Sequence, residues 1–349
     1  MTRSLTDTLV RQQQERWSAF CHEAQATGRA FAPDSAGARA LATAFEFSAF
    51  VASNCIKYPQ MALDLISSGD LTASAGQGYM DHRLKPFLAS LVHASADATP
   101  PPEQILNPLK SALRRFRRRE MVRVAVRDLT GLSEVEETMA DLSALARCAL
   151  NGALALLYNA MGTTHGIPRD TDGDPQRLVV IGMGKLGAGE LNFSSDVDLI
   201  FTFPANGETT GSGRAVTNET FFTRLCRLLI QVIGEPTVDG FVFRVDTRLR
   251  PYGDSGPLVM NFDHMEDYYQ YQGREWERYA LIKAAVVAGD ADAGMQLLEQ
   301  LRPFVFRRYL DFGVFESLRE MKRKITAEVR RKKLHDNIKL GSGGIREIE

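Results

Sequence analysis

A glycine-rich turn followed by two closely spaced aspartates constrains this chain more than any other feature. Residues 182–201 read GMGKLGAGELNFSSDVDLIF, with a short apolar run before the glycines and a second one that starts at Asp196 and Asp198. Side chains two positions apart on a strand point to the same face, so both carboxylates are predicted to project together. Two like charges held side by side require a cation. The segment therefore predicts a small sheet with a metal site at the start of one strand.

The expected metal is magnesium. Oxygen-only ligands suit Mg²⁺, which is typically held by one or two carboxylates together with substrate phosphates. The glycines that precede the aspartates let backbone N–H groups approach a phosphate chain, and Lys185 adds a positive charge beside them. An isolated D-x-D is more often a solvated strand end, but the glycines before this one and the apolar strand after it favour a functional interpretation.

A dinucleotide-binding turn is the main alternative for the same glycines. Gly182, Gly184 and Gly187 match G-x-G-x-x-G after a predicted strand. That fingerprint needs a crossover helix after the glycines and an acid about 20 residues further on. Here the aspartate strand begins only nine residues after Gly187, so no full crossover helix fits, and the dinucleotide interpretation is disfavoured.

A third acid lies in the segment FVFRVDTRLRP at 241–251, whose strict alternation predicts a strand. Asp246 would share one face of it with Arg244, Arg248 and Arg250, and neighbouring arginines lower the pKa of a carboxyl group. The acid would complete a two-metal site, and the arginines would hold phosphate oxygens. A surface ladder of salt bridges is the alternative, which the position one helix after the aspartate strand disfavours.

The remaining pattern predicts an α+β protein in three parts. Residues 1–165 are expected to form an N-terminal helical region, 166–260 the sheet-containing core, and 261–349 a C-terminal helical region. Within the core, apolar runs and breakers predict strands at 177–183 and 196–204, loops at 166–177 and 205–216, and an amphipathic helix from Phe221 to Val232.

Composition and charge exclude several classes of protein. The formal net charge of -1 over 349 residues does not suit a general nucleic-acid binder. The basic stretch at 110–127 is predicted to be a solvated or partner-facing helix. The sequence has no run of about 18 apolar residues, so no membrane span is predicted. Its four scattered cysteines fit a reducing cytoplasm. The ending GSGGIREIE lacks the usual polar tail, so the chain is expected to be the N-terminal part of a longer polypeptide.

Several long motifs resemble one enzyme family. GMGKLGAGELNFSSDVDLIF resembles the nucleotidyltransferase signature of the bifunctional glutamine synthetase adenylyltransferase/adenylyl-removing enzymes, and RVDTRLRPYGDSGPLV resembles the family's third-acid segment. Segments at 113–146, 268–284 and 341–349 are also similar to the family, in the same order. The resemblance implies a DNA polymerase beta-like nucleotidyltransferase core.

The resemblance also implies an activity. It points to the family's N-terminal copy, which removes AMP from an adenylylated tyrosine of glutamine synthetase by phosphate attack and releases ADP, thereby regulating nitrogen assimilation. Forward adenylyl transfer from ATP to glutamine synthetase or another hydroxyl acceptor is the alternative. The PII signal protein is the expected regulatory partner, and neither nucleic acid nor a membrane is expected to bind. At Ala188 glycine is common in the family, and the alanine should be tolerated provided that the position does not need a positive φ.

The site residues follow by matching motifs. The implied catalytic and metal-binding residues are Asp196, Asp198 and Asp246. The implied nucleotide- and phosphate-binding residues are Gly184, Lys185, Gly187, Ser194, Ser195, Arg248 and Arg250.

Overall fold

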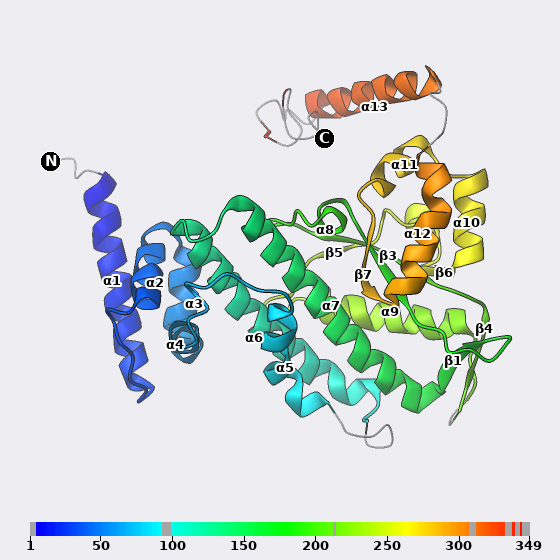
Figure 1. Ribbon diagram of the computed structural model, residues 1–349. Helices are drawn as coiled ribbons and strands as arrows, with labels where there is room; N and C mark the ends of the chain where they lie inside the picture. Colours follow the sequence, from blue (N-terminus) through cyan, green and yellow to red (C-terminus); the bar gives the residue numbers. More distant parts are fainter. Residues whose placement is uncertain are drawn as a thin grey trace.

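The structure is a computed structural model that describes residues 5–92, 99–211, 214–306, 312–331, 337–338 and 343. Helices lead from one end of the molecule to a small sheet at the other, and α6 and α7 run between the two ends (Figure 1). The mixture of helices and one small mixed sheet confirms the predicted α+β class.

The first part of the chain is helical, as predicted, over its described residues. Hydroxyl side chains cap two of its helices, since Ser35 accepts from Ala38 N and Ser48 accepts from Val51 N. The elements are α1 (Leu5–Ala26), α2 (Ala36–Phe47), α3 (Ala49–Lys57), α4 (Pro59–Ser67), α5 (Tyr79–Leu88), the 3-10 turn η1 (Ala89–Leu91), α6 (Pro102–Leu129) and α7 (Val135–His165).

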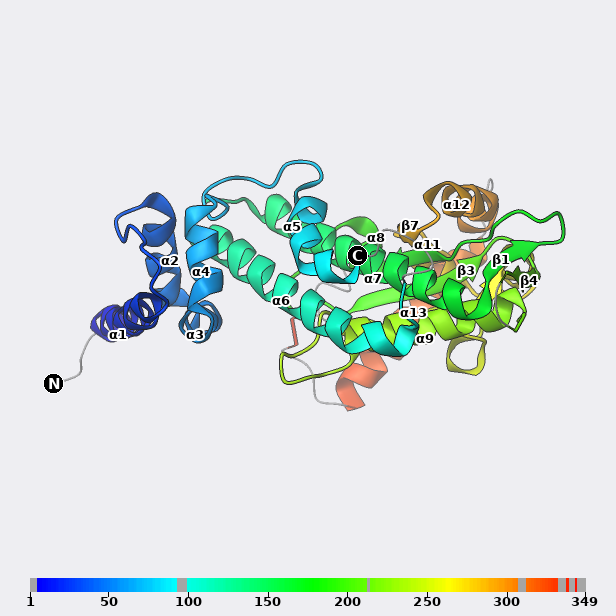
Figure 2. The same cartoon turned by 90° about the horizontal axis from the view of Figure 1, so that it is seen from below.

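These helices divide between two apolar cores. The first four surround a core of their own that also takes in Val122 and Val126 of α6, and they form a separate group at one end of the molecule (Figure 2). Helices α5, α6 and α7 share the second core with α9 (Asn218–Gly234) and one face of the sheet. Long helix α6 therefore connects the N-terminal helices to the sheet.

The sheet has five strands in the order β5-β3-β2-β7, with β6 also paired to β3. Strand β2 pairs antiparallel with β3 and β7, whereas β5 and β6 pair parallel with β3. The predicted strands at 177–183 and 196–204 and the predicted amphipathic helix are confirmed. The strands are β2 (Val179–Met183), β3 (Val197–Phe203), β5 (Val245–Asp246), β6 (Val259–Asn261) and β7 (Ala285–Gly289).

The two faces of the sheet pack against different helices. Leu199 and Phe201 lie in the core shared with α7 and α9. Ile200 lies in a third core on the opposite face, with α10 (Phe262–Tyr271) and α12 (Ala291–Val305). Because side chains alternate along a strand, Asp198 is on the same face as Ile200, at the start of β3. Further helical elements are the short helix α11 (Glu275–Leu281), α13 (Phe312–Arg331) and the 3-10 turn η3 (Gly253–Ser255), and α13 lies beyond α11 (Figure 1).

The strand predicted at 241–251 is much shorter than expected. Only Val245 and Asp246 pair with β3, and the chain then turns, with Gly253 N donating to Arg250 O. Turn hydrogen bonds and a left-handed Tyr252 (φ 61°) end the strand despite its alternating sequence. The prediction that four charged side chains follow one another along a strand face is therefore wrong.

Three other segments also differ from the predictions. The loops expected at 166–177 and 205–216 contain β1 (Ile167–Asp170) and β4 (Gly207–Thr210), which pair as a separate two-stranded sheet. The region from 262 onward was expected to be helical, yet β7 adds a strand to the main sheet. A run as short as Ala285–Gly289 cannot be assigned by periodicity, because it pairs only through tertiary contacts with β2.

The basic stretch at 110–127 is buried in α6, which overturns the prediction of a solvated or partner-facing helix. Five of its arginines are less than a tenth exposed: Arg114, Arg118, Arg119, Arg123 and Arg127. Burial of charge requires partners, and each of these guanidinium groups donates to a carboxylate or a backbone carbonyl. Charge in this segment is used to join helices inside the protein.

Helix α7 is the one helix, among the described residues, that is long and apolar enough to cross a bilayer. Most of its apolar window, 61%, is buried inside the structure. It packs against α6, α9 and β7, which is the position of a core helix.

Candidate functional site

Asp198 and Asp246 lie side by side at one edge of the sheet. They are register partners on the parallel strands β3 and β5. Paired residues on neighbouring strands direct their side chains to the same face, so the two carboxylates are neighbours, and both side chains are half-buried. The structure therefore brings together two of the three acids that the sequence predicted.

The glycine turn faces this pair of acids. It forms α8 (Gly184–Ala188), and Gly184 begins it with a φ of 54°. A Cβ atom on Gly184 would lie 3.5 Å from Asp198 Oδ2, so the turn passes directly beside the carboxylate. Ala188 has no positive φ, which fits the expected tolerance of alanine there. Lys185, the basic residue of the turn, is half-exposed.

Gly187 has a packing role that the sequence did not predict. A Cβ atom there would come within 1.8 Å of Lys283 O and 2.4 Å of Gly182 O. The backbone of the turn is therefore pressed against the segment after α11. Lys283 Nζ also donates to Glu190 Oε2 at 2.9 Å, which adds an ion pair to the same junction.

Asp196 is placed differently from its two partners. It precedes β3, is half-exposed, and its Oδ1 accepts from Arg244 Nε. Arg244 Nη2 also donates to Ser194 O at 2.6 Å. Within the described ranges no three acid, histidine or cysteine side chains are grouped to hold a metal. The expected convergence of Asp196 with the other two acids is absent, because the i, i+2 rule applies only within a strand and Asp196 lies outside it.

The loop between the glycine turn and Asp196 is built on local hydrogen bonds. Ser195 Oγ donates to Asn192 Oδ1 at 2.8 Å and accepts from Asn192 N, while Ser194 N donates to Asn192 Oδ1. Helix α7 anchors the loop, because Leu191 N donates to Ser143 Oγ at 3.1 Å and Leu191 is fully buried. Ser143 is a positioning residue that sequence reasoning missed, since nothing local links it to the loop.

Asp246 is enclosed by Arg248. Its Oδ1 accepts from Arg248 N at 2.8 Å, and both of its oxygens accept from the Arg248 side chain. These side-chain hydrogen bonds lower the pKa of Asp246 below its usual value, and the same pairing raises the pKa of Arg248. The Asp246 side chain is 16% exposed and that of Arg248 71%.

Arg250 points elsewhere. Its Nη1 donates to Thr247 O at 2.8 Å and to Thr247 Oγ1, and its Nη2 reaches Gly256 O. The side chain is 12% exposed. Arg250 thus closes the turn after β5, and its positive charge also helps to lower the pKa of Asp246.

A further contact ties Arg244 to the helical region. The Arg244 and Arg117 guanidinium groups both lie over the Phe241 ring, at 5.8 and 5.5 Å from its centroid. Burial lowers the pKa of Arg117, and the positive charges of Arg118 and Arg244 add to that effect. The partner of Asp196 therefore shares an aromatic ring with Arg117 of α6.

The pair formed by Asp198 and Asp246 fits Mg²⁺. Hard cations of this size take one or two carboxylates and leave the other positions to phosphate and water. Adjacent half-buried carboxylates, with a glycine backbone beside one of them, supply that donor set. Asp196 would have to leave Arg244 in order to join them.

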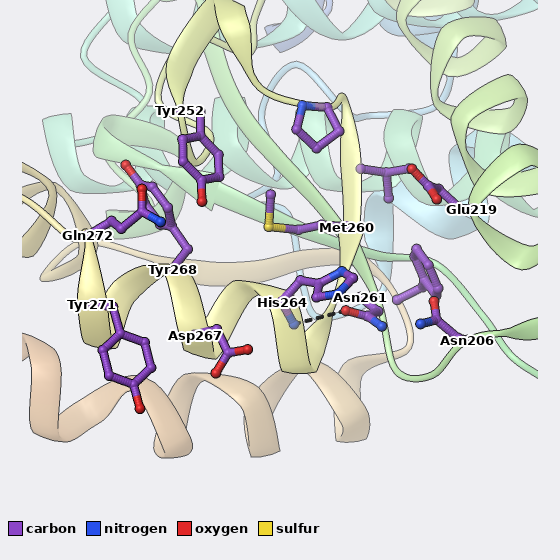
Figure 3. Close-up of a pocket in the computed structure, with 13 residues that line it drawn as sticks. Asn206, Glu219, Tyr252, Met260, Asn261, His264, Asp267, Tyr268, Tyr271 and Gln272 are labelled. Carbon is purple, nitrogen blue, oxygen red and sulfur yellow. Dashed lines mark hydrogen bonds between the residues drawn. The ribbon is translucent and has the colours of Figure 1, made fainter.

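A separate cavity of about 400 Å³ lies at the other end of β3 (Figure 3). Tyr252, Met260 and His264 line it, together with Glu219 and Asp267. Across the part of the chain that the structure describes, no lysine or arginine lines this cavity. It therefore does not suit a phosphate group, and the acids at the start of β3 remain the candidate site.

Family models and individual relatives both match this chain, and most of the matches name one family. The model of the family "Glutamate-ammonia ligase adenylyltransferase" matches residues 38–300, and that of "GlnD PII-uridylyltransferase" matches residues 319–349. The chain is 53% identical over 306 residues to the bifunctional glutamine synthetase adenylyltransferase/adenylyl-removing enzyme of Nitrosococcus oceani, which covers 86% of this chain and 30% of that protein.

Two further relatives carry the same name. The protein of Thioalkalivibrio sulfidiphilus is 51% identical over 310 residues, covering 89% of this chain and 31% of the relative. The protein of Pseudomonas aeruginosa is 51% identical over 303 residues, covering 86% of this chain and 30% of the relative. The chain thus spans about a third of the length of these relatives and matches their N-terminal part. A family model over most of the chain and identities near 50% leave one conclusion: the chain belongs to the glutamate-ammonia ligase adenylyltransferase family.

Proposed function

We propose that this chain removes AMP from an adenylylated tyrosine of glutamine synthetase, using inorganic phosphate and releasing ADP. The observation that carries the proposal is the register pairing of Asp198 with Asp246 beside Gly184, in a chain of this family. The relatives are named for both adenylyl transfer and adenylyl removal. The similarity to the family's N-terminal copy supports the removal direction.

The reaction conserves all atoms. An oxygen of phosphate attacks the phosphorus of the tyrosyl-AMP bond, a new P–O–P bond forms, and the bond from phosphorus to the tyrosine oxygen breaks. The phenolic oxygen leaves with the electron pair and takes up a proton, while AMP and phosphate become ADP. Such transfers depend mainly on positioning and on the neutralisation of charge.

Asp198 and Asp246 are the residues that would hold Mg²⁺, with Asp196 as a third ligand once it leaves Arg244. Bound there, the ion would supply positive charge to the phosphoryl oxygens. On the protein side, the absence of a side chain at Gly184 would let a phosphate approach the backbone beside Asp198, and Lys185 adds a cation to the same turn. Arg248, whose side chain is 71% exposed beside Asp246, is suited to an incoming phosphate.

The core itself is proposed to be DNA polymerase beta-like. Support comes from an antiparallel pair, β2 and β3, in which the acids follow a glycine turn, and from a third acid on the neighbouring strand β5.

The PII signal protein and ATP or ADP remain proposed partners, and a cytoplasmic location remains a prediction.

Forward adenylyl transfer from ATP is the second candidate, because the relatives' name includes it. The two directions are separated by incubating the chain with Mg²⁺ and either of two substrate pairs. Adenylylated glutamine synthetase with phosphate should yield ADP and unmodified protein. If ATP instead modifies the unadenylylated protein with release of pyrophosphate, and phosphate has no effect, the proposed direction is wrong and the nucleotidyltransferase assignment stands.

A further inference from the structure

The site contains its own cation. The Arg248 guanidinium holds both oxygens of Asp246, at 3.0 and 2.9 Å from Nε. One guanidinium therefore neutralises Asp246, the register partner of Asp198, which is an electrostatic task expected of a bound metal ion.

The exposure of this arginine distinguishes it from its neighbour. The Arg248 side chain is 71% exposed, and its guanidinium group donates to the Asp246 carboxylate. Arg250 is 12% exposed and is fixed to the backbone carbonyls of the turn. Swinging Arg248 outward would break one ion pair whose arginine is mostly exposed, whereas moving Arg250 would break the turn.

We propose that Arg248 is an exchangeable counter-ion: it holds the Asp246 carboxylate, leaves it when a divalent cation binds, and then holds the attacking phosphate. Two cations cannot share the same carboxylate oxygens without repulsion, so binding of the metal and release of the arginine are coupled. A released guanidinium next to a metal-bound acid is well suited to bidentate binding of a phosphate oxyanion. This inference rests on the proposed function.

Direct binding measurements test the exchange without any turnover. Titration calorimetry with Mn²⁺ as the probe would compare the wild-type chain with Arg248→Gln. Removal of the competing cation should tighten Mn²⁺ binding by about two- to fivefold, the range for an exposed ion pair. With saturating Mg²⁺, titration with inorganic phosphate should show about tenfold weaker binding in the variant, because a charge-assisted contact is lost.

Arg302→Gln is the matched control. Arg302 forms an exposed ion pair with Glu299 on α12, and its removal changes the net charge by the same amount. It should leave both affinities unchanged. If Arg248→Gln binds Mn²⁺ as the wild type does or more weakly, or binds phosphate normally, the exchange is refuted while the metal site stands. If the wild type binds no Mn²⁺ at all, the metal site of the proposed function fails, and the exchange fails with it.

Discussion

Asp198 and Asp246 are register partners on two parallel strands, although 48 positions separate them in the chain. The pairing is set by the sheet and not by local sequence, because β5 adds only two residues to the edge of β3. A strand this short would contribute little to a sheet by itself. Its position places a second carboxylate beside the first, and that arrangement is the basis of the proposed chemistry.

Replacement of Asp198 by asparagine should abolish turnover with little effect on folding. The change removes one charge and keeps the shape, and loss of a metal ligand costs several kcal/mol of transition-state stabilisation, or at least about a hundredfold in rate. The variant's rate at saturating Mg²⁺ should be compared with its melting temperature. Near-normal turnover in Asp198→Asn would remove this residue from the site, and the same test applies to Asp196→Asn.

Asp246→Ala is expected to be as damaging to turnover as the loss of Asp196 or Asp198. If Asp246 served only to pair with Arg248, activity would survive and only the stability of the fold would fall. Turnover and unfolding free energy measured on the same preparation separate the two roles. A variant that is active and slightly destabilised would contradict the catalytic assignment.

Two glycines of the same turn should respond very differently to alanine. Gly187→Ala would force a Cβ atom to 1.8 Å from Lys283 O, so a loss of about 2–3 kcal/mol of stability is expected from overpacking. Gly189 has a φ of 74° and open space around it, so Gly189→Ala should cost only about 1 kcal/mol for the left-handed backbone. Chemical denaturation measures both, and equal losses would show that the contact with Lys283 does not constrain the turn.

The ion pairs of α6 make a prediction about pH. Burial opposes ionisation of Asp70, but hydrogen bonds from Arg119 and Arg83 prevail and hold its pKa below the ordinary 3.8. A lowered folded-state pKa contributes stability that is complete above about pH 4 and is lost as the pH falls through the folded pKa. The difference in unfolding free energy between wild type and Asp70→Asn should therefore be constant near neutrality and shrink below pH 4.

An exposed pair provides the control for that series. Asp64 pairs with Arg29 at the surface, with side chains 54% and 52% exposed, so Asp64→Asn should cost roughly 0–1 kcal/mol. Urea unfolding from pH 3 to 7 would measure both variants. A cost for Asp70→Asn that stays the same down to pH 3 would contradict the role given to the buried pairs.

The features predicted correctly from sequence were those set by local pattern. Strands β2 and β3 follow from apolar runs beside glycines, and α9 follows from its amphipathic spacing. The sequence predicts that Asp246 joins Asp198 in one site, but it does not predict that their strands are neighbours. Strand order depends on contacts between residues that are distant in sequence. The alternating sequence around Asp246 predicts a long strand. In the structure the strand ends at Asp246, and the Arg250 side chain then donates to carbonyl groups of the turn that follows.

The incorrect prediction for α6 has a physical cause, which is that charge alone does not indicate exposure. Arg123 is fully buried, and its partner Asp141 lies on α7, so local sequence gives no sign of that pairing. Asp196 and Arg244 are a similar case in the site, since they meet only after the sheet forms. Ion pairs across elements are decided by packing, which periodicity does not encode.

Isotopic labelling tests the central claim most directly. Adenylylated glutamine synthetase would be incubated with Mg²⁺ and ³²P-labelled inorganic phosphate, with the wild-type chain or with Asp198→Asn, and the nucleotide products separated. The account predicts that the wild type places the label in the terminal phosphate of ADP and that the variant forms none. Release of unlabelled AMP by the wild type, or label in ADP with the variant at the wild-type rate, would contradict it.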